Sequence, residues 1–153
     1  MNATDSLKGA YPMQILSSIT DWQDHVQAGM KYLKTAGNGL NRRAVFNNEL
    51  IFQLAAMAIE KIIVGICQYH GQMPTDHTLS GLVEALGPVC PLSDDLAGMI
   101  RRVEQVDDMC SLSPDNRLPP GDVEIEIALL AGREVACFAK QHIPLQDMAT
   151  AAA

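Results

Sequence analysis

The chain has 153 residues, of which 48% are hydrophobic and 5% aromatic, and its net charge is −7. A chain of this length forms one domain with a core large enough to fold without disulfides or a structural metal. The acidic balance argues against extended nucleic-acid binding, because Lys and Arg contacts to phosphate supply most of that affinity. It leaves open a small basic pocket for a single phosphate group.

Four cysteines are spread along the chain without any Cys-x-x-Cys or Cys/His cluster: Cys67, Cys90, Cys110 and Cys137. This spacing predicts neither a zinc site nor a disulfide framework, and free, mostly buried thiols in a reducing cytosol explain it. The N-terminal residues lack the apolar core of a secretory signal. Glu49, Glu60 and Lys61 interrupt the most apolar stretch, so we expect no membrane span and a cytoplasmic protein.

Helical periodicity and helix-ending residues divide the chain into five predicted helices, at about residues 18–36, 43–69, 77–86, 94–108 and 122–141. The second is apolar around most of its circumference, which is typical of a central helix with neighbours on several sides. Thr75 or Asp76 is expected to cap the third helix, Ser93 or Asp94 to begin the fourth, and Asp122 to cap the fifth.

The chain contains no alternating strand pattern and no internal repeat. The predicted fold is therefore all-α, an up-and-down bundle of four long helices plus one short helix over residues 17–143. Residues 1–16 are expected to form a flexible lead and residues 144–153 a disordered tail. In the fourth helix Arg101, Arg102, Glu104 and Asp107 are expected to face mostly outward, and in the fifth Leu130 is expected in the core.

A polar stripe runs along the central helix. At about 100° per residue, one narrow arc contains Glu49, Gln53, Ala56, Glu60 and Cys67. Glu60 stands between isoleucines, and an ionised carboxylate there needs partners or exposure. Two interpretations stay open: a rim residue with its carboxylate in water, or a carboxylate that faces a cleft or a dimer partner.

Other candidate chemistry is weak. The carboxylate-bridged bundle site needs Glu-x-x-His on facing helices, and the four histidines His25, His70, His77 and His142 are isolated. The Gly37-Asn38-Gly39 turn matches no phosphate-loop pattern and is interpreted as a helix–helix turn. Asp107-Asp108 is either a solvated helix end or a site for metal or base chemistry, beside the Pro-rich segment 111–121.

Four further features occur in one order along residues 22–141. The opening helix contains Trp22 and Tyr32-Leu33, and the central helix carries Ala-Ile-Glu-Lys at the end of Gln53–Lys61. The turn Gly71–Leu82 has the form Gly-x-x-Pro…His-x-Leu-x-x-Leu, and a Pro-containing loop separates two late helices. Together they resemble the HEPN family, the "higher eukaryotes and prokaryotes nucleotide-binding" domains.

The resemblance implies a bundle that is commonly dimeric and one of two functional groups. One group cleaves RNA without metal through Arg-x(4–6)-His, often as a toxin beside a nucleotidyltransferase partner. The other lacks that motif and has nucleotide-binding or scaffold roles. Here Arg101, Arg102 and Arg117 have no histidine at that spacing, and Arg133 and His142 are too far apart. Asp107–Cys110 occupies the matching place, where acidic residues would repel phosphate.

The leading hypothesis is a non-catalytic HEPN-like module that needs no cofactor, forms a homodimer, and binds a nucleotide, another small ligand or a nucleotidyltransferase-type protein. The alternatives are a divergent, metal-independent, toxin-like RNase and a purely structural dimeric interaction protein. No catalytic or metal-ligating residue is assigned. The candidates for ligand binding are Glu60, His77, Arg102, Asp107, Asp108 and Glu134.

Overall fold

A computed structural model of the protein describes residues 10–111 and 118–144, with the side chains of residues 22–108 and 118–144. The helices are α1 (Ala10–Gly39), α2 (Asn48–Tyr69), α3 (Leu79–Leu86), α4 (Asp94–Ser111) and α5 (Asp122–His142). The described part of the chain contains no strand, so the all-α prediction is confirmed, with four long helices and one short. Most of the expected flexible lead and disordered tail lies outside the described residues.

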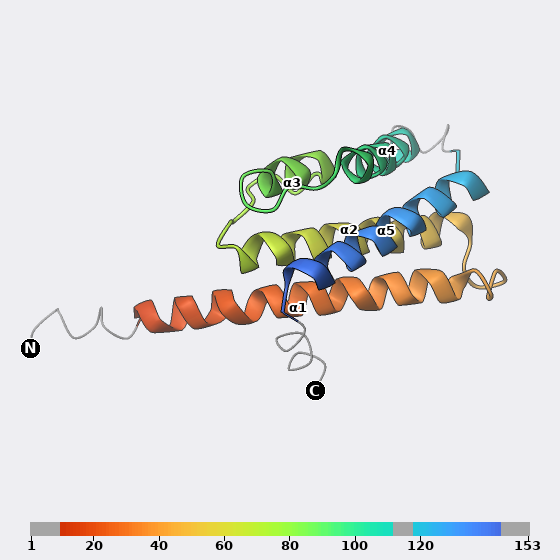
Figure 1. Ribbon diagram of the computed structural model, residues 1–153. Helices are drawn as coiled ribbons and strands as arrows, with labels where there is room; N and C mark the ends of the chain where they lie inside the picture. Colours follow the sequence, from red (N-terminus) through yellow and green to blue (C-terminus); the bar gives the residue numbers. More distant parts are fainter. Residues whose placement is uncertain (1–9, 112–117, 145–153) are drawn as a thin grey trace, which may run out of the picture.

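The long helices alternate in direction along the chain (Figure 1). α1 and α2 run antiparallel and share the largest interface, and α5 packs along α2 on another side. α3 and α4 lie on the side of α2 that faces away from α1, where α4 also contacts α5. α2 therefore contacts all four other helices, and it holds them in position.

α2 is long and apolar enough to cross a membrane by length and composition, but 67% of its most apolar stretch is buried inside the molecule. Its buried residues include Phe52, Ile59, Ile62 and Ile66, all at most 1% exposed. Burial on several sides explains why apolar residues surround most of this helix. Its hydropathy is that of a core helix covered by α1, α3 and α5.

Glycines bring α1 and α2 into close contact. A β-carbon on Gly65 would lie 2.4 Å from Val26 Cγ2 and 2.9 Å from the Trp22 carbonyl oxygen. A β-carbon on Gly29 would lie 2.5 Å from Ile62 Cγ1. Both positions are fully occupied by the neighbouring helix, so this α1–α2 seam has no space for larger residues.

The structure corrects several predicted helix ends. α1 begins at Ala10 instead of about Ser18, and α2 begins at Asn48 instead of Arg43. The Asn47 side chain caps α2 by accepting a hydrogen bond from the Leu50 backbone N–H at 2.8 Å, which leaves residues 43–47 outside the helix.

Two more caps differ from expectation, and one agrees. Thr78 caps α3 in place of Thr75 or Asp76, because its hydroxyl accepts a hydrogen bond from the Gly81 N–H at 3.1 Å. Gly121, not Asp122, precedes the first turn of α5, and it makes no side-chain cap bond. Ser93 caps the start of α4 as predicted, since its Oγ accepts from the Leu96 N–H at 3.2 Å.

A polar clamp joins the start of α2 to the start of α5. Asn48 Nδ2 donates to the Pro120 carbonyl oxygen at 2.8 Å and to Asp122 Oδ1 at 3.3 Å. Arg43 donates to Asn48 Oδ1 and lies 4.0 Å from Asp122 Oδ1. These contacts fix where the chain enters α5.

Candidate functional site

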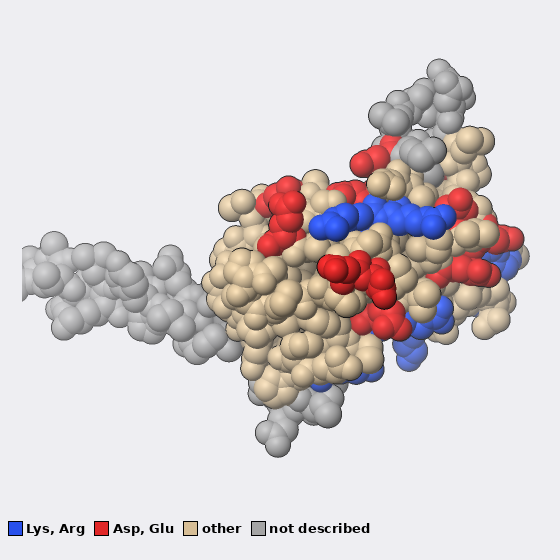
Figure 2. Space-filling view, turned by 45° about the horizontal axis from the view of Figure 1, so that its top comes forward, with Lys and Arg blue, Asp and Glu red and all other residues tan. Residues whose placement is uncertain are grey.

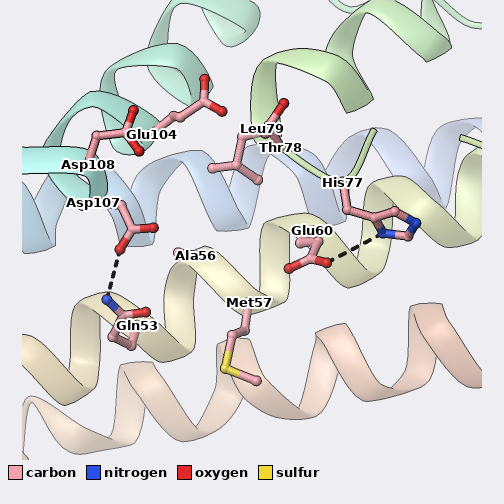
Figure 3. A pocket seen from close by; sticks show the side chains of 10 residues that line it. All are labelled: Gln53, Ala56, Met57, Glu60, His77, Thr78, Leu79, Glu104, Asp107 and Asp108. Carbon is pink, nitrogen blue, oxygen red and sulfur yellow. Dashed lines mark hydrogen bonds and ion pairs between the residues drawn. The ribbon is translucent and has the colours of Figure 1, made fainter. Parts of the chain in front are cut away.

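The predicted polar stripe of α2 forms one wall of a cleft. The cleft has a volume of about 180 Å³ and lies between α2, the turn before α3 and the C-terminal half of α4 (Figure 3). It is lined by Gln53, Ala56, Met57, Glu60, His77, Thr78, Leu79, Glu104, Asp107 and Asp108. Three segments that are separate in the sequence, at residues 53–60, 77–79 and 104–108, thus meet at one place beside α2.

The middle of the stripe faces this cleft, and its two ends do not. Gln53, Ala56 and Glu60 line the cleft at spacings of three and four residues. Glu49 is half-buried outside it, and Cys67 is fully buried in the core. The stripe therefore has different surroundings along its length. Its middle forms a cleft wall, its first residue is half-buried outside the cleft, and its last residue belongs to the core.

Glu60 and His77 form a pair at one end of the cleft. Glu60 Oε1 lies 3.7 Å from His77 Nδ1, and this is an ion pair when the imidazole is protonated (Figure 3). The Glu60 side chain is 36% exposed and that of His77 57%. Both interpretations of Glu60, a rim residue in water and a carboxylate facing a cleft, therefore apply, because its side chain is partly exposed and lines the cleft.

Hydrogen bonds hold α4 in place against α2 and α3. Gln53 Nε2 donates to Asp107 Oδ1 at 2.9 Å (Figure 3). The backbone N–H of Ser80 donates to Glu104 Oε1 at 3.3 Å, and the Ser80 hydroxyl donates to Glu104 Oε2. Glu104 therefore lies at the first turn of α3, where a helix favours negative charge. Both α4 carboxylates are half-buried, which corrects the expectation that Glu104 and Asp107 face mostly outward.

The turn before α3 is fixed by its own hydrogen bonds. Asp76 Oδ1 accepts from the Thr78 backbone N–H at 2.9 Å. This bond and the Thr78 hydroxyl hold the pKa of Asp76 below its ordinary value. Gly81 lies directly beneath the Asp76 carboxyl, since a β-carbon there would be 2.5 Å from Asp76 Oδ2. The turn that presents His77 and Thr78 to the cleft is thereby held in one conformation.

The cleft is strongly acidic. Four carboxylates line it, from Glu60, Glu104, Asp107 and Asp108, and its lining includes neither Lys nor Arg. The side chains of Gln53 and Ser80, which donate to Asp107 and Glu104, are themselves neutral. On the face shown in Figure 2, acidic clusters lie beside basic side chains. The cleft therefore favours a positively charged group and repels an anion.

Metal binding finds no support in the described part of the chain. The described residues include no group of three or more His, Cys, Asp or Glu side chains arranged to hold a metal ion. The four carboxylates of the cleft lie around its walls and do not converge on one point (Figure 3). What the arrangement can do is bind an organic cation by charge and hydrogen bonds.

The six predicted site residues divide into two groups. Glu60, His77, Asp107 and Asp108 come together in the cleft. Arg102 is exposed on α4 outside its lining, and Glu134 is exposed on α5, which packs on another side of α2.

Four lining residues were not predicted: Met57, Thr78, Leu79 and Glu104. Glu104 could have been found from its spacing, because it stands about one turn before Asp107 and Asp108 on the same helix face.

Two cysteines lie in the core near each other, away from the cleft. Cys67 is fully buried and Cys90 is 4% exposed. Burial, with a smaller contribution from the neighbouring Cys90 thiol, raises the pKa of Cys67 to about 11, and burial raises that of Cys90 as well. Both are free thiols, as is the exposed Cys137. The prediction of free thiols is confirmed for these three; the Cys110 side chain lies outside the described residues.

Comparison of the chain with known protein families, with curated proteins and with solved structures found no match. The resemblance to the HEPN family stays a prediction that rests on the sequence motifs alone.

Proposed function

We propose that this protein is a non-catalytic, HEPN-like helical binding module whose acidic cleft receives a basic side chain of a protein partner. The observation that carries the proposal is the lining of the cleft, with four carboxylates and no Lys or Arg. A volume of about 180 Å³ suits one ammonium or guanidinium group with part of its alkyl chain. Met57 lines the same cleft and supplies an apolar contact for that chain.

A protein partner is favoured over a free small molecule because α2 exposes apolar residues both in the cleft and on the helix face that carries it. Met57 is 38% exposed and Leu50 40%, and both belong to the part of α2 that its neighbours leave open. Exposed apolar residues beside a charged anchor are typical of protein interfaces. A nucleotidyltransferase-type protein or a second copy of this chain could supply the basic residue, so both of these predicted partners remain within the proposal.

The alternatives that involve phosphate fit this cleft less well. A nucleotide or an RNA strand would bring negative charge against Glu60, Glu104, Asp107 and Asp108. RNA cleavage also requires a cation placed at the scissile phosphate, together with a proton donor or acceptor. His77 could act on a proton, but its neighbour in the cleft is Glu60 instead of an Arg or Lys.

The proposal is tested with a fluorescein-labelled tetralysine peptide, with fully acetylated tetralysine as the uncharged control. We expect the charged peptide to bind more tightly than the acetylated one in an anisotropy titration, with affinity that falls as salt screens the charges. Replacing two cleft carboxylates in the double variant Asp107→Asn/Asp108→Asn should weaken binding about tenfold, since each lost charge contact contributes up to about 1 kcal/mol.

A matched variant separates the cleft from the net charge of the protein. Glu126→Gln/Glu134→Gln removes the same number of negative charges from exposed positions on α5, outside the cleft. This variant should bind the peptide like the unaltered protein. Equal weakening in both double variants would attribute the binding to net charge alone and contradict the proposal. Cleavage of mixed RNA by the unaltered protein would favour the RNase alternative.

A further inference from the structure

A second hollow, the α1–α5 groove, lies on another side of the molecule. It has a volume of about 450 Å³, which is within the usual range for small-molecule pockets. Its lining comes from the C-terminal third of α1 and the C-terminal half of α5, and none of its residues belongs to the acidic cleft. The two sites are therefore separate, and ligand binding in the groove is independent of the function proposed for the cleft.

The groove is lined in part by apolar side chains, and a glycine leaves space in it. Met30, Leu33 and Ala136 supply its apolar surface. Leu33 lies directly on α5 at Gly132, where a β-carbon would be 2.7 Å from Leu33 Cδ1. At Gly37, by contrast, a β-carbon would meet no atom within 4 Å. The helices thus touch near Gly132 and leave unfilled space beside Gly37.

Three cations surround this groove. Lys34 of α1 and Arg133 and Lys140 of α5 line it, and its lining contains neither Asp nor Glu. The whole chain has 11 Lys and Arg against 18 Asp and Glu, so a site with basic residues alone departs from the general charge balance. All three side chains are exposed, and none makes a hydrogen bond or ion pair with another described residue. Their charges are available to an anion.

We propose that the α1–α5 groove binds a small organic anion with an apolar body. The apolar body would lie on Met30, Leu33 and Ala136, and the anionic head, such as a carboxylate, would lie among Lys34, Arg133 and Lys140. Charge complementarity selects the anion, and the apolar part of the lining selects a ligand with a hydrocarbon or aromatic body. A long polyanion fits less well, because the chain has a net charge of −7 and acidic clusters lie on the face shown in Figure 2.

The first test uses 8-anilinonaphthalene-1-sulfonate, an amphipathic anion that fluoresces in apolar surroundings, with decanoate and decanol as competitors. We expect saturable binding to the folded protein, and displacement by decanoate at concentrations about tenfold lower than by uncharged decanol. Adenosine monophosphate serves as a third competitor. Equal competition by decanol, or stronger competition by the nucleotide than by decanoate, would overturn the proposal.

Two variants locate the binding. Gly37→Leu places a side chain in the unfilled space, where its β-carbon clashes with nothing, and should abolish binding while the thermal unfolding midpoint stays close to that of the unaltered protein. Arg133→Gln/Lys140→Gln should weaken binding about tenfold. The matched control Arg101→Gln/Arg102→Gln removes the same charge from exposed positions on α4 and should leave binding unchanged. Unchanged affinity in Gly37→Leu, or equal losses in the two double variants, would contradict the proposal.

A chemical footprint supplies an independent readout. Cys137 lines the groove and is exposed, whereas Cys67 and Cys90 are buried. In a Cys110→Ser background, saturating decanoate should slow modification of Cys137 by N-ethylmaleimide, because the bound ligand covers the thiol. Modification at the same rate with and without decanoate would place the ligand elsewhere and overturn the proposal.

Discussion

The two sides of α2 differ in how closely their neighbours approach. Against α1, Gly29 and Gly65 let the helices touch until even a β-carbon has no room. On the side of α3 and α4, by contrast, mostly polar side chains line a cleft of about 180 Å³. A single helix, α2, thus provides both the rigid support of the domain and the wall of a candidate site. We therefore expect substitutions in the seam to change stability strongly, and substitutions in the cleft to change binding instead.

The largest effect is expected at Gly65. Gly65→Ala puts a methyl group where Val26 and the Trp22 carbonyl already lie, so the helices must separate. We expect a loss of about 2–3 kcal/mol in the free energy of unfolding, measured by urea denaturation.

Gly98 provides the matched control. It lies in the interior of α4, and a β-carbon there meets no atom within 4 Å. Gly98→Ala should therefore raise stability by about 0.5–1 kcal/mol through helix propensity alone. Similar losses in both variants would show that the α1–α2 seam is not closed in the way described.

The second-largest effect concerns the buried thiol of Cys67, which makes the free energy of unfolding depend on pH. Burial raises the pKa of Cys67 from 9.0 to about 11, so the unfolded chain loses this proton before the folded protein does. Below pH 9 the thiol adds no pH dependence, and between pH 9 and 11 the folded state should lose roughly 1–2 kcal/mol of stability from this thiol.

The contribution of Cys67 is isolated by difference. Urea unfolding of the unaltered protein and of Cys67→Ala is compared from pH 8 to 11, because lysines and tyrosines titrate equally in both. The difference in unfolding free energy between the two proteins should become smaller as pH rises. Parallel curves would mean that the Cys67 thiol ionises freely in the fold.

A smaller effect on stability is expected at the hydrogen bond between Ser80 of α3 and Glu104 of α4, beside the cleft. Ser80→Ala removes the hydroxyl that donates to Glu104 and loosens the contact between α3 and α4. Because water reaches this half-buried pair, we expect a loss of about 1 kcal/mol in the free energy of unfolding. A loss as large as that of Gly65→Ala would remove the contrast between the seam and the cleft.

The smallest effect is expected at the rim. Glu60→Gln removes the charge that pairs with His77, but both side chains are substantially exposed. We expect a change in unfolding free energy below about 0.5 kcal/mol, together with weaker tetralysine binding. A thermal shift measured beside the anisotropy titration separates the two outcomes. A variant that unfolds easily but still binds would reverse the assignment of Glu60 from a binding residue to a structural one.

The sequence predicted the all-α fold and the central helix well, because both depend on local periodicity. The polar arc at Gln53, Ala56 and Glu60 was visible for the same reason, as was the Ser93 cap. The start of α2 was misplaced because the sequence pattern does not single out Asn47 as the cap, and the start of α1 was misplaced because the helix continues upstream of Ser18 to Ala10.

Not all residues that line the cleft could be predicted from helical periodicity, because contacts between helices decide which side chains reach it. Glu104 was assigned to the outer face of α4, and it is the first turn of α3 that draws it inward through Ser80. Leu130 was expected in the core and is 45% exposed, because α5 buries Ile125, Leu129 and Ala136 instead. The basic groove could not be predicted either, since Lys34 and Lys140 are far apart in sequence and meet only after α5 packs beside α1.

The Asn48 clamp has a consequence for the order of folding. It joins Asn48 to Asp122, positions 74 residues apart, whereas α1 and α2 are consecutive helices that meet across one short turn. Closing the larger loop costs more chain entropy, so we expect the α1–α2 hairpin to assemble first and α5 to dock onto it later. The acidic cleft and the basic groove would then appear at different moments: the groove can exist only once α5 has reached its place beside α1.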